Sequence, residues 1–386
     1  MKTCNHTFNH LAQVNKSGNV VPCCHISVHN EEVVFNLSNI ESLDGILNSN
    51  YWKTLREDIK TGDNEACNNC WRVENTGGHS KRMWSNEKPV NTPYVIEDLE
   101  IALDTTCNMM CRMCQPSQSS KWASATDVLK KLDKLERPYG DRYNQEKLNP
   151  TNHNDIMRVL NNTDLSHINA INIVGGEPFY SKNLLPLLER LDSQAGIENI
   201  TLGFNTNGSI FPKDKVLDIL SRAKDVCIDF SIDSIGDLAT VTRHGIDWNT
   251  IDSNIQKFIS YFGKNKIRIH SVISLLNANR IQEVYDYAHD LQLRSWTWQF
   301  LSGPQYLSVY QIPKEIRKKW QIKADKNCTF VDWTRDYYNS ELISTEEAKQ
   351  MFGSFLQSTS IIDTYHDCTF ESVNPEMYNL IKALNQ

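Results

Sequence analysis

The chain has 386 residues, of which 40% are hydrophobic and 23% charged, and its formal net charge is −7. This length allows two or three domains, one of which could be an α/β barrel of roughly 250 residues. An acidic surface without a Lys/Arg block repels phosphate backbones, so nucleic acid is not expected as the main partner. No apolar run approaches the ~20 residues of a membrane span, and the N-terminus has no apolar signal core. We therefore expect a cytoplasmic protein with no membrane partner.

The first 95 residues are rich in Asn, Cys and Gly, which predicts short strands around a metal site. One helix stands out at residues 48–60, with Ser49 or Asn50 as its N-cap. In a cytosolic chain, clustered cysteines bind metal more often than they form disulfides. This segment holds one of two cysteine groups, which consists of Cys4, Cys23, Cys67 and Cys70.

From residue 99 onward, short β-like runs alternate with helical patterns, which predicts βαβ units with parallel strands. The expected helices include residues 181–194, 212–224, 248–262 and 280–291. Six strands indicate an incomplete barrel, and the stretch from Pro313 is predicted to be helical and loop-rich. The predicted domains are residues 1–95, 96–312 and 313–386. The six expected strands are residues 99–105, 168–174, 199–205, 225–233, 266–274 and 295–301.

Polar residues alternate with apolar ones along these strands, whereas buried parallel strands usually read as continuous apolar runs. A side-chain period of two places each set on one face, so the polar set should point into the barrel. We therefore expect Asp229, Arg268 and His270 to line a site, binding substrate or moving a proton. The alternative is an ion pair between neighbouring strands that mainly supports folding.

The second cysteine group, Cys107, Cys111 and Cys114, follows directly on the first barrel strand. Barrels of this class place their chemistry at the C-terminal ends of the strands. Three thiolates can hold three irons of a [4Fe–4S] cluster and leave the fourth iron open for a ligand. The alternative is a three-cysteine zinc site completed by a distant His.

The spacing Cys107-x-x-x-Cys111-x-x-Cys114 resembles that of the radical S-adenosylmethionine (SAM) superfamily. The resemblance implies that the amino and carboxylate groups of SAM bind the open iron. The reduced cluster then breaks a C–S bond of SAM, and the resulting 5′-deoxyadenosyl radical abstracts hydrogen from a substrate. The residue before the last cysteine is often aromatic in the family and packs near adenine; here it is Met113, whose thioether can fill that space.

Further motifs fit the same superfamily across residues 97–303. "INIVGGEPFY" resembles the motif that grips the SAM amino group, although a plain turn would also close this strand. Asn205 opens "NTNG", which is by itself a generic turn signal. "VTRHG" suggests an arginine for the SAM carboxylate, although a surface arginine is the alternative. The resemblance assigns SAM contacts to Gly175, Gly176, Glu177, Pro178, Asn205, Ser231, Asp233 and Arg243.

The N-terminal cysteines resemble the auxiliary-cluster "twitch" module, a shortened SPASM domain, which here precedes the barrel. This resemblance implies one auxiliary [4Fe–4S] cluster; a structural zinc ribbon is the alternative. Cys24 could replace Cys23 as the ligand. Isolated cysteines are usually small buried hydrophobes, and the remaining ones are Cys227, Cys328 and Cys368.

The sequence as a whole predicts a radical SAM enzyme with a partial (βα)6 barrel, an N-terminal twitch-like module and a helical C-terminal extension. Its cofactors would be SAM, a SAM-binding [4Fe–4S] cluster and the auxiliary [4Fe–4S] cluster. A peptide or protein substrate is slightly favoured, and an electron donor such as flavodoxin or ferredoxin is implied. The alternatives are a small-molecule dehydrogenase and a non-catalytic iron–sulfur or zinc protein.

Overall fold

The structure is a computed structural model that describes residues 2–8, 12–14, 18–24, 26, 35–62, 64–75, 77–87, 94–135, 153–245, 247–301, 303–323 and 344–386. The chain divides into two compact units. Unit 1 consists of Met1–Thr105, Pro150–Asn205 and Pro212–Cys227, and unit 2 of Thr106–Asn149, Thr206–Phe211 and Ile228–Gln386. Cys328 lies outside the described residues. The predicted domain boundaries near residues 95 and 312 stay predictions.

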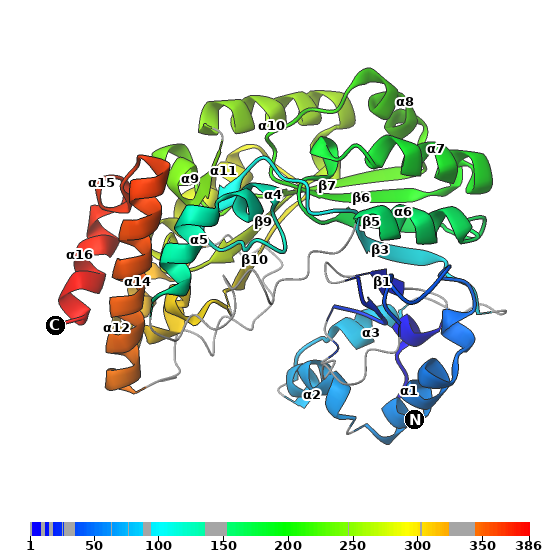
Figure 1. Cartoon of the computed structure of the whole chain (residues 1–386), viewed down its shortest axis with the longest axis horizontal. Coiled ribbons are helices and arrows are strands. Elements are labelled where there is room, and N and C mark those ends of the chain that lie inside the picture. Colours follow the sequence, from blue (N-terminus) through cyan, green and yellow to red (C-terminus); the bar gives the residue numbers. More distant parts are fainter. Residues whose placement is uncertain are drawn as a thin grey trace. The chain divides into compact units, whose positions relative to one another are not determined.

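Unit 1 is built on parallel strands that continue into the N-terminal segment (Figure 1). β3 (Asp98–Ala102), β5 (Ala170–Val174) and β6 (Thr201–Thr206) pair in parallel, and β7 (Asp225–Ser231) is the next neighbour of β6. On the other side β3 pairs in parallel with β1 (Ala12–Val14), which pairs antiparallel with β2 (Val20–Val21). The helices are α1 (Asn50–Thr61), α2 (Asn68–Asn75), α3 (Lys81–Ser85), α6 (His153–Asn162), α7 (Leu184–Ala195) and α8 (Asp214–Arg222).

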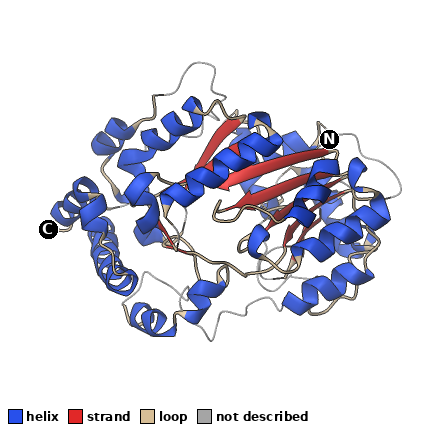
Figure 2. Ribbon diagram, turned by 90° about the horizontal axis from the view of Figure 1, so that it is seen from above, coloured by secondary structure: helices blue, strands red, loops and turns tan. Residues whose placement is uncertain are grey.

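Unit 2 continues β7 with β9 (Ile267–Ile273) and β10 (Ser295–Phe300), all parallel. α10 packs on β9 and α11 on β10. Figure 2 shows helices lying alongside the strands. A separate antiparallel pair joins β4 (Met110–Cys111) to β8 (Arg243–His244). The helices are α4 (Ser120–Ser124), α5 (Thr126–Asp133), α9 (Gly236–Thr242), α10 (Trp248–Phe262), α11 (Ile281–Asp290), α12 (Lys314–Arg317), α14 (Thr345–His366), α15 (Phe370–Val373) and α16 (Pro375–Leu384).

The six expected barrel strands correspond to β3, β5, β6, β7, β9 and β10, so the predicted α/β fold with parallel strands is confirmed. The expected alternation is also present. Ile228 and Phe230 of β7 and Ile267 and Ile269 of β9 are fully buried, whereas the polar residues between them are half-buried. β1 and β2 lie in the segment where short strands were expected, but their positions and their pairing with β3 were not predicted. No helix in the described part of the chain is long and apolar enough to cross a membrane.

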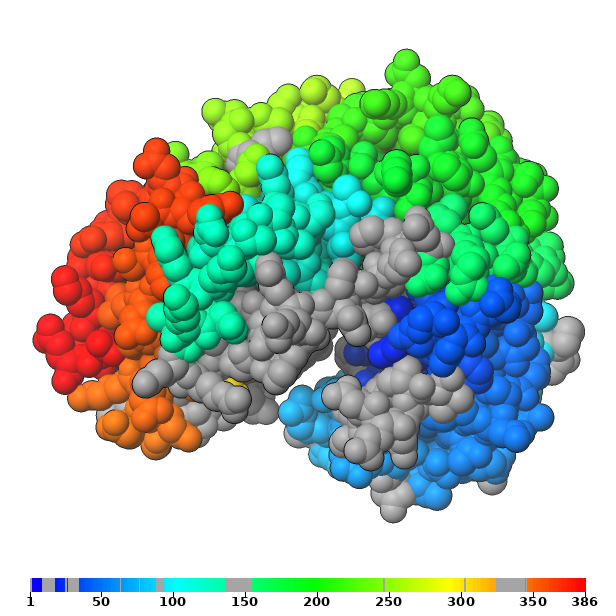
Figure 3. Space-filling model, viewed as in Figure 1, coloured from blue at the N-terminus to red at the C-terminus, as the bar shows by residue number. Residues whose placement is uncertain are grey.

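Capping residues define the ends of helices α1 and α14. α1 begins after Ser49, whose side chain accepts a hydrogen bond from the Trp52 backbone N–H, as predicted. α14 begins with a capping box between Ser344 and Glu347 and ends at Asp367, which adopts a left-handed conformation. Within unit 2, α14 packs beside α5 and α16, and its orange surface adjoins the turquoise surface of α5 in Figure 3. The predicted helical C-terminal extension is thus confirmed for its described residues.

Candidate active site

The three cysteines of the loop after β3 gather in unit 2. Cys107 and Cys111 are buried, and Cys114 is half-buried. Burial raises the pKa of the Cys111 thiol; Arg243 opposes this effect, and the neighbouring Cys114 and Cys107 raise the pKa further. Mutual influence of this kind requires the three sulfur atoms to lie near one another. The loop therefore presents three converging soft ligands.

Amide and hydroxyl groups surround Cys107. The side-chain amide of Asn207 donates to the Cys107 sulfur at 3.9 Å and to Asn108 Oδ1 at 3.2 Å. Asn108 also donates to Ser209 Oγ at 3.0 Å, and Ser120 Oγ accepts from the Cys107 backbone N–H at 3.0 Å. This network was missed in the sequence, where Asn207 was considered only as part of a turn. Hydrogen bonds to sulfur tune an iron–sulfur cluster.

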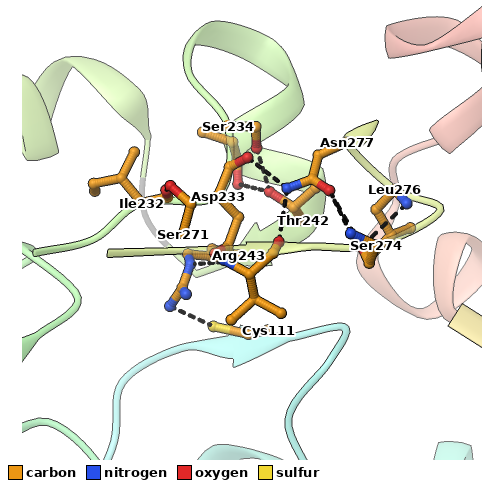
Figure 4. Close-up of polar contacts among 12 residues, drawn as sticks. Cys111, Ile232, Asp233, Ser234, Thr242, Arg243, Ser271, Ser274, Leu276 and Asn277 are labelled. Carbon is orange, nitrogen blue, oxygen red and sulfur yellow. Dashed lines mark hydrogen bonds and ion pairs between the residues drawn. The ribbon is translucent and has the colours of Figure 1, made fainter. Parts of the chain in front are cut away.

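Arg243 lies between the Asp233 carboxylate and Cys111, one of the three loop cysteines (Figure 4). Its Nε donates to Asp233 Oδ2 at 2.7 Å, and a terminal guanidinium nitrogen lies 3.8 Å from the Cys111 sulfur. Asp233 has no exposed surface, and its other oxygen accepts from the Val272 backbone N–H at 2.7 Å. Burial would lower the pKa of Arg243, but Asp233 and Cys111 raise it above the usual value. Asp233 is thus placed to orient Arg243.

Buried polar contacts hold the segment that carries Asp233. The Asn277 side-chain amide donates to the carbonyl oxygens of Asp233, at 2.6 Å, and Val272, at 2.9 Å (Figure 4). The hydroxyl groups of Ser234 and Thr242 are 2.6 Å apart, which ties the end of α9 to the same segment. Buried networks that are fully satisfied make a site rigid. Arg243 therefore projects from a fixed support.

The predicted SAM loop after β5 lies in unit 1 and is held against the end of β3. Gly175 has φ +124°, and an added Cβ would stand 2.4 Å from the Asp104 carbonyl oxygen. The Gly176 N–H donates to that same oxygen at 2.8 Å. The Asp104 carboxylate in turn accepts from Ser181 and, at 3.5 Å, from Asn183. Glycine is needed here because the backbones approach too closely for a side chain.

The other predicted SAM contacts occupy strand ends and loops. Glu177 is buried, and its side chain accepts from the Phe179 backbone N–H at 3.2 Å, which caps the short 3₁₀ helix η5 (Pro178–Tyr180). Asn205 lies in β6 of unit 1 and is half-buried. In unit 2, Met113 lies between two of the loop cysteines, and Ser231 ends β7 opposite His270 of β9. Their predicted contacts with SAM stay predictions.

Of the three expected lumen residues, two contact each other. Asp229 and Arg268 are directly opposite in the register of β7 and β9, and both nitrogens of the fork, Nε at 2.6 Å and one terminal nitrogen, bond the carboxylate. His270 Nδ1 lies 2.9 Å from Thr297 Oγ1 on β10. Burial lowers the pKa of His270, although Asp233 and Asp229 oppose this effect. Asp229 and Arg268 thus form an inter-strand ion pair, and their role in a substrate site stays a prediction.

The four predicted N-terminal ligands line one pocket of unit 1: Cys4, Cys23, Cys67 and Cys70. Burial, together with Cys4 and Cys70, raises the pKa of Cys67 to about 12. Cys24 is exposed and accepts a hydrogen bond from Lys81 Nζ at 2.8 Å. The geometry thus favours Cys23 over Cys24 as the fourth ligand.

Arg82 closes one side of this pocket. Its Nε and a terminal nitrogen donate to Glu74 at 2.9 and 2.6 Å, and its guanidinium lies 5.0 Å from the centre of the Trp71 ring. A fixed cation beside four thiols favours the thiolate forms that metal binding requires.

The donor sets define the class of protein. Three neighbouring thiols in the loop after β3, and four thiols that line a pocket of unit 1, suit iron–sulfur clusters in an α/β protein. Within unit 2, Arg243 beside Cys111 offers a cation to a ligand with an anionic group. This is the architecture of an iron–sulfur protein with a second, auxiliary site.

Comparison with known families agrees with this class. Residues 103–291 match the radical SAM superfamily, and residues 4–71 match the SPASM domain, described as an iron-sulfur cluster-binding domain. The chain therefore carries a radical SAM domain and, at its N-terminal end, an auxiliary iron–sulfur cluster-binding domain. The expected cofactors, SAM and two iron–sulfur clusters, follow from these two domains.

Curated relatives are distant in sequence. Molybdenum cofactor biosynthesis protein 1 of Dictyostelium discoideum is 21% identical over 64% of this chain and 37% of its own length. A GTP 3′,8-cyclase of Desulforamulus reducens is 26% identical over 50% of this chain and 49% of its own length. One from Petrotoga mobilis is 24% identical over 57% and 63%. The chain thus spans only about 37–63% of the relatives it matches.

Two solved structures resemble this chain at low sequence identity. "Native anSMEcpe with bound AdoMet" has a TM-score of 0.36 at 14% identity, over 72% of this chain and 62% of that one. Streptococcus suis SuiB bound to the precursor peptide SuiA has a TM-score of 0.35 at 14% identity, over 98% and 75%.

Proposed function

We propose that this protein cleaves SAM reductively and uses the resulting radical to abstract hydrogen from a substrate. The observation that carries the proposal is the arrangement of Cys111, Arg243 and Asp233, in which a buried carboxylate aims a guanidinium at the cysteine loop. A cluster held by Cys107, Cys111 and Cys114 would supply one electron to SAM. Cleavage of a C–S bond would then divide SAM into methionine and a 5′-deoxyadenosyl radical.

The residues of the chain position SAM for this step. Arg243 offers a planar guanidinium to the SAM carboxylate, and Asp233 fixes its orientation. In the loop after β5, Gly175 and Gly176 permit close approach of the backbone, and Glu177 offers an acceptor to the ammonium group. Asn207 and Ser120 orient the segment around Cys107. These roles rest on the donor chemistry of each side chain.

The substrate is proposed to be a peptide or protein, as the auxiliary module of the N-terminal segment suggests by resemblance. A second candidate is a small molecule, since curated relatives are named GTP 3′,8-cyclases. The electron donor would be a small reductase partner such as flavodoxin or ferredoxin. The auxiliary cluster would be held by Cys4, Cys23, Cys67 and Cys70.

The test is anaerobic reconstitution with iron, sulfide, SAM and dithionite, followed by measurement of 5′-deoxyadenosine. Wild-type protein should produce it, and the Cys107→Ala/Cys111→Ala/Cys114→Ala variant should not, while retaining the iron of the auxiliary site. A triple variant that still yields 5′-deoxyadenosine would contradict the proposal. GTP, and cell extract separated into peptide and small-molecule fractions, are then compared for increased yield; this step distinguishes the two substrate classes.

A further inference from the structure

Outside the two cysteine sites, two histidines and a cysteine converge in unit 2. The side chains of His244 in β8, His366 at the end of α14 and Cys368 just beyond that helix each offer a ligand atom, and these atoms all lie within 4.8 Å of one another. His244 is 122 positions before His366 in the sequence, so the fold brings it to His366 and Cys368. None of the predicted SAM or cluster ligands belongs to this group.

The imidazole rings of His244 and His366 lie face to face. Their centroids are 3.7 Å apart and their planes differ by only 7°. Nitrogens on one side of such a stacked pair are separated by about the ring distance. Two nitrogens bound to one tetrahedral zinc at ~2.0–2.1 Å are ~3.4 Å apart, which is close to this spacing. The nitrogen lone pairs of stacked rings point in parallel directions, so the two rings must tilt out of this stack to bind one ion.

His366 supplies the second, independent observation. Only 7% of this residue is exposed, and neither ring nitrogen has a hydrogen-bond partner among the described residues. Buried polar atoms are nearly always satisfied, and a bound ion is one explanation of an exception. Its stacking partner His244 is half-buried, and a neutral imidazole offers one ring nitrogen as a metal ligand.

Arg112 is a positively charged residue beside this group of ligands. Burial raises the pKa of the Cys368 thiol, and Arg112, which lies 3.9 Å from the sulfur, opposes this effect. The same guanidinium is paired with the Asp363 carboxylate, which offsets most of its charge at the site. The site thus offers two imidazole nitrogens and a thiol that would lose its proton on binding a metal, beside an arginine paired with Asp363.

We propose that His244, His366 and Cys368 form a third metal site, which binds Zn²⁺ through two nitrogens and one sulfur. Such a mixed set is of the borderline type that zinc accepts, and three protein ligands leave the fourth position for water. His244 follows Arg243 in β8, which pairs with the strand that contains Cys111. Bound zinc would therefore fasten the end of α14 to the strand pair beside the cysteine loop.

The test uses the full, iron–sulfur-reconstituted protein, incubated with Zn²⁺ and freed of excess metal by gel filtration. We expect about one zinc per chain, with X-ray absorption showing one sulfur at ~2.3 Å and two nitrogens at ~2.0 Å. Cys368→Ser and His366→Gln should each weaken zinc binding by at least ~10-fold and leave the iron content unchanged. The exposed His289→Gln and Cys24→Ser are matched controls that should retain zinc.

Two results would overturn the site. Absorption showing four sulfurs would place the zinc at the N-terminal cysteines, and zinc binding that is unchanged in Cys368→Ser would exclude this ligand. Failure of wild-type protein to bind zinc also rejects the proposal. Cys368 is only half-buried, so its serine variant keeps the test valid if His366→Gln does not fold. None of these readouts depends on SAM cleavage, so the proposed function is tested separately.

Discussion

Asp233 and Arg243 form an ion pair of 2.7 Å in which the carboxylate has no exposed surface and 12% of the arginine side chain is exposed. The pair adjoins Cys111 rather than the protein surface. A buried carboxylate that orients a cation beside a reactive site is comparable to the outer-shell partners of metal ligands. The role of Arg243 in SAM binding can therefore be tested by substitution of Asp233.

Asp233→Asn should lower the rate of SAM cleavage by about 10–100-fold, because Arg243 loses the charge that fixes it. SAM binding, measured on the reconstituted protein, should weaken in parallel, and the iron content should stay at the wild-type level. Asp237→Asn, on the exposed first turn of α9, is the matched control and should behave as wild type. Full activity of Asp233→Asn would show that Arg243 needs no such support.

Gly175→Ala should abolish SAM binding because the new methyl group would meet the Asp104 carbonyl oxygen at 2.4 Å. Gly45→Ala separates this clash from backbone strain, since Gly45 also has positive φ but no atom within 4 Å of the added Cβ. The left-handed strain alone costs about 1–2 kcal/mol. We therefore expect Gly45→Ala to lower the unfolding free energy modestly and keep SAM binding, as calorimetry and a binding assay would show. Equal SAM binding by both variants would refute the close-approach argument.

Cys23 and Cys24 provide a test of the auxiliary site with adjacent residues. Only Cys23 lines the pocket, whereas Cys24 contacts Lys81. With two [4Fe–4S] clusters, wild-type protein should carry ~8 irons per chain, and Cys23→Ala should lose about four of them. Cys24→Ala should retain the wild-type number. Iron and zinc analysis after reconstitution gives the result, and a loss confined to Cys24→Ala would reverse the assignment.

The fold could be predicted largely because its signals are local. In β7 and β9 the alternation of Ile228, Phe230, Ile267 and Ile269 with polar residues identified both strands and their buried face. The spacing of the cysteine loop and the Gly175–Pro178 motif likewise depend on neighbouring residues. The short strands β1 and β2 carry little such signal, and pairing with β3 and with each other defines them.

Contacts between distant residues could not be read from the sequence. Cys23 and Cys24 are adjacent and chemically identical, and only the contact with Lys81 distinguishes them. Cys368 was expected to be a small buried hydrophobe, yet it lies near His244 and His366. Asn207 carried only a turn signal, although its amide contacts Cys107. In each case the deciding partner lies tens of residues away or more, so no local pattern records it.

Glu74 gives a prediction on pH. Burial raises its pKa, but hydrogen bonds from Arg82 and Ser80 lower it more, so the folded-state pKa lies below the usual value. The unfolded chain therefore binds the proton more readily in acid. This contribution to stability is complete above the unfolded pKa of ~4.3 and is lost as the pH falls through the folded pKa.

Denaturant unfolding of wild type and Glu74→Gln at a series of pH values measures this contribution. The stability difference between the two proteins should be largest near neutral pH and shrink below about pH 4.5. Glu57→Gln, at an exposed residue paired with Lys60, is the control and should change stability little. Iron analysis at each pH ensures that both proteins have the same cluster content. A difference that grows in acid would contradict the sign of the shift.

The role of Asp229 and Arg268 in function can be tested separately from their role in folding. Their opposite charges neutralise each other between β7 and β9, so exchanging the two residues keeps the ion pair. We expect Asp229→Asn to cleave SAM normally, since neither residue is a predicted SAM contact, but to lose substrate turnover. Arg268 is one-third exposed, so the loss of stability should be well below the ~3–5 kcal/mol of a fully buried pair. The exchange Asp229→Arg with Arg268→Asp restores the ion pair but reverses its polarity. It should recover the unfolding free energy of wild type, measured by denaturant unfolding, and leave turnover abolished. Turnover that returns together with stability would assign the pair to folding alone and remove it from the substrate site.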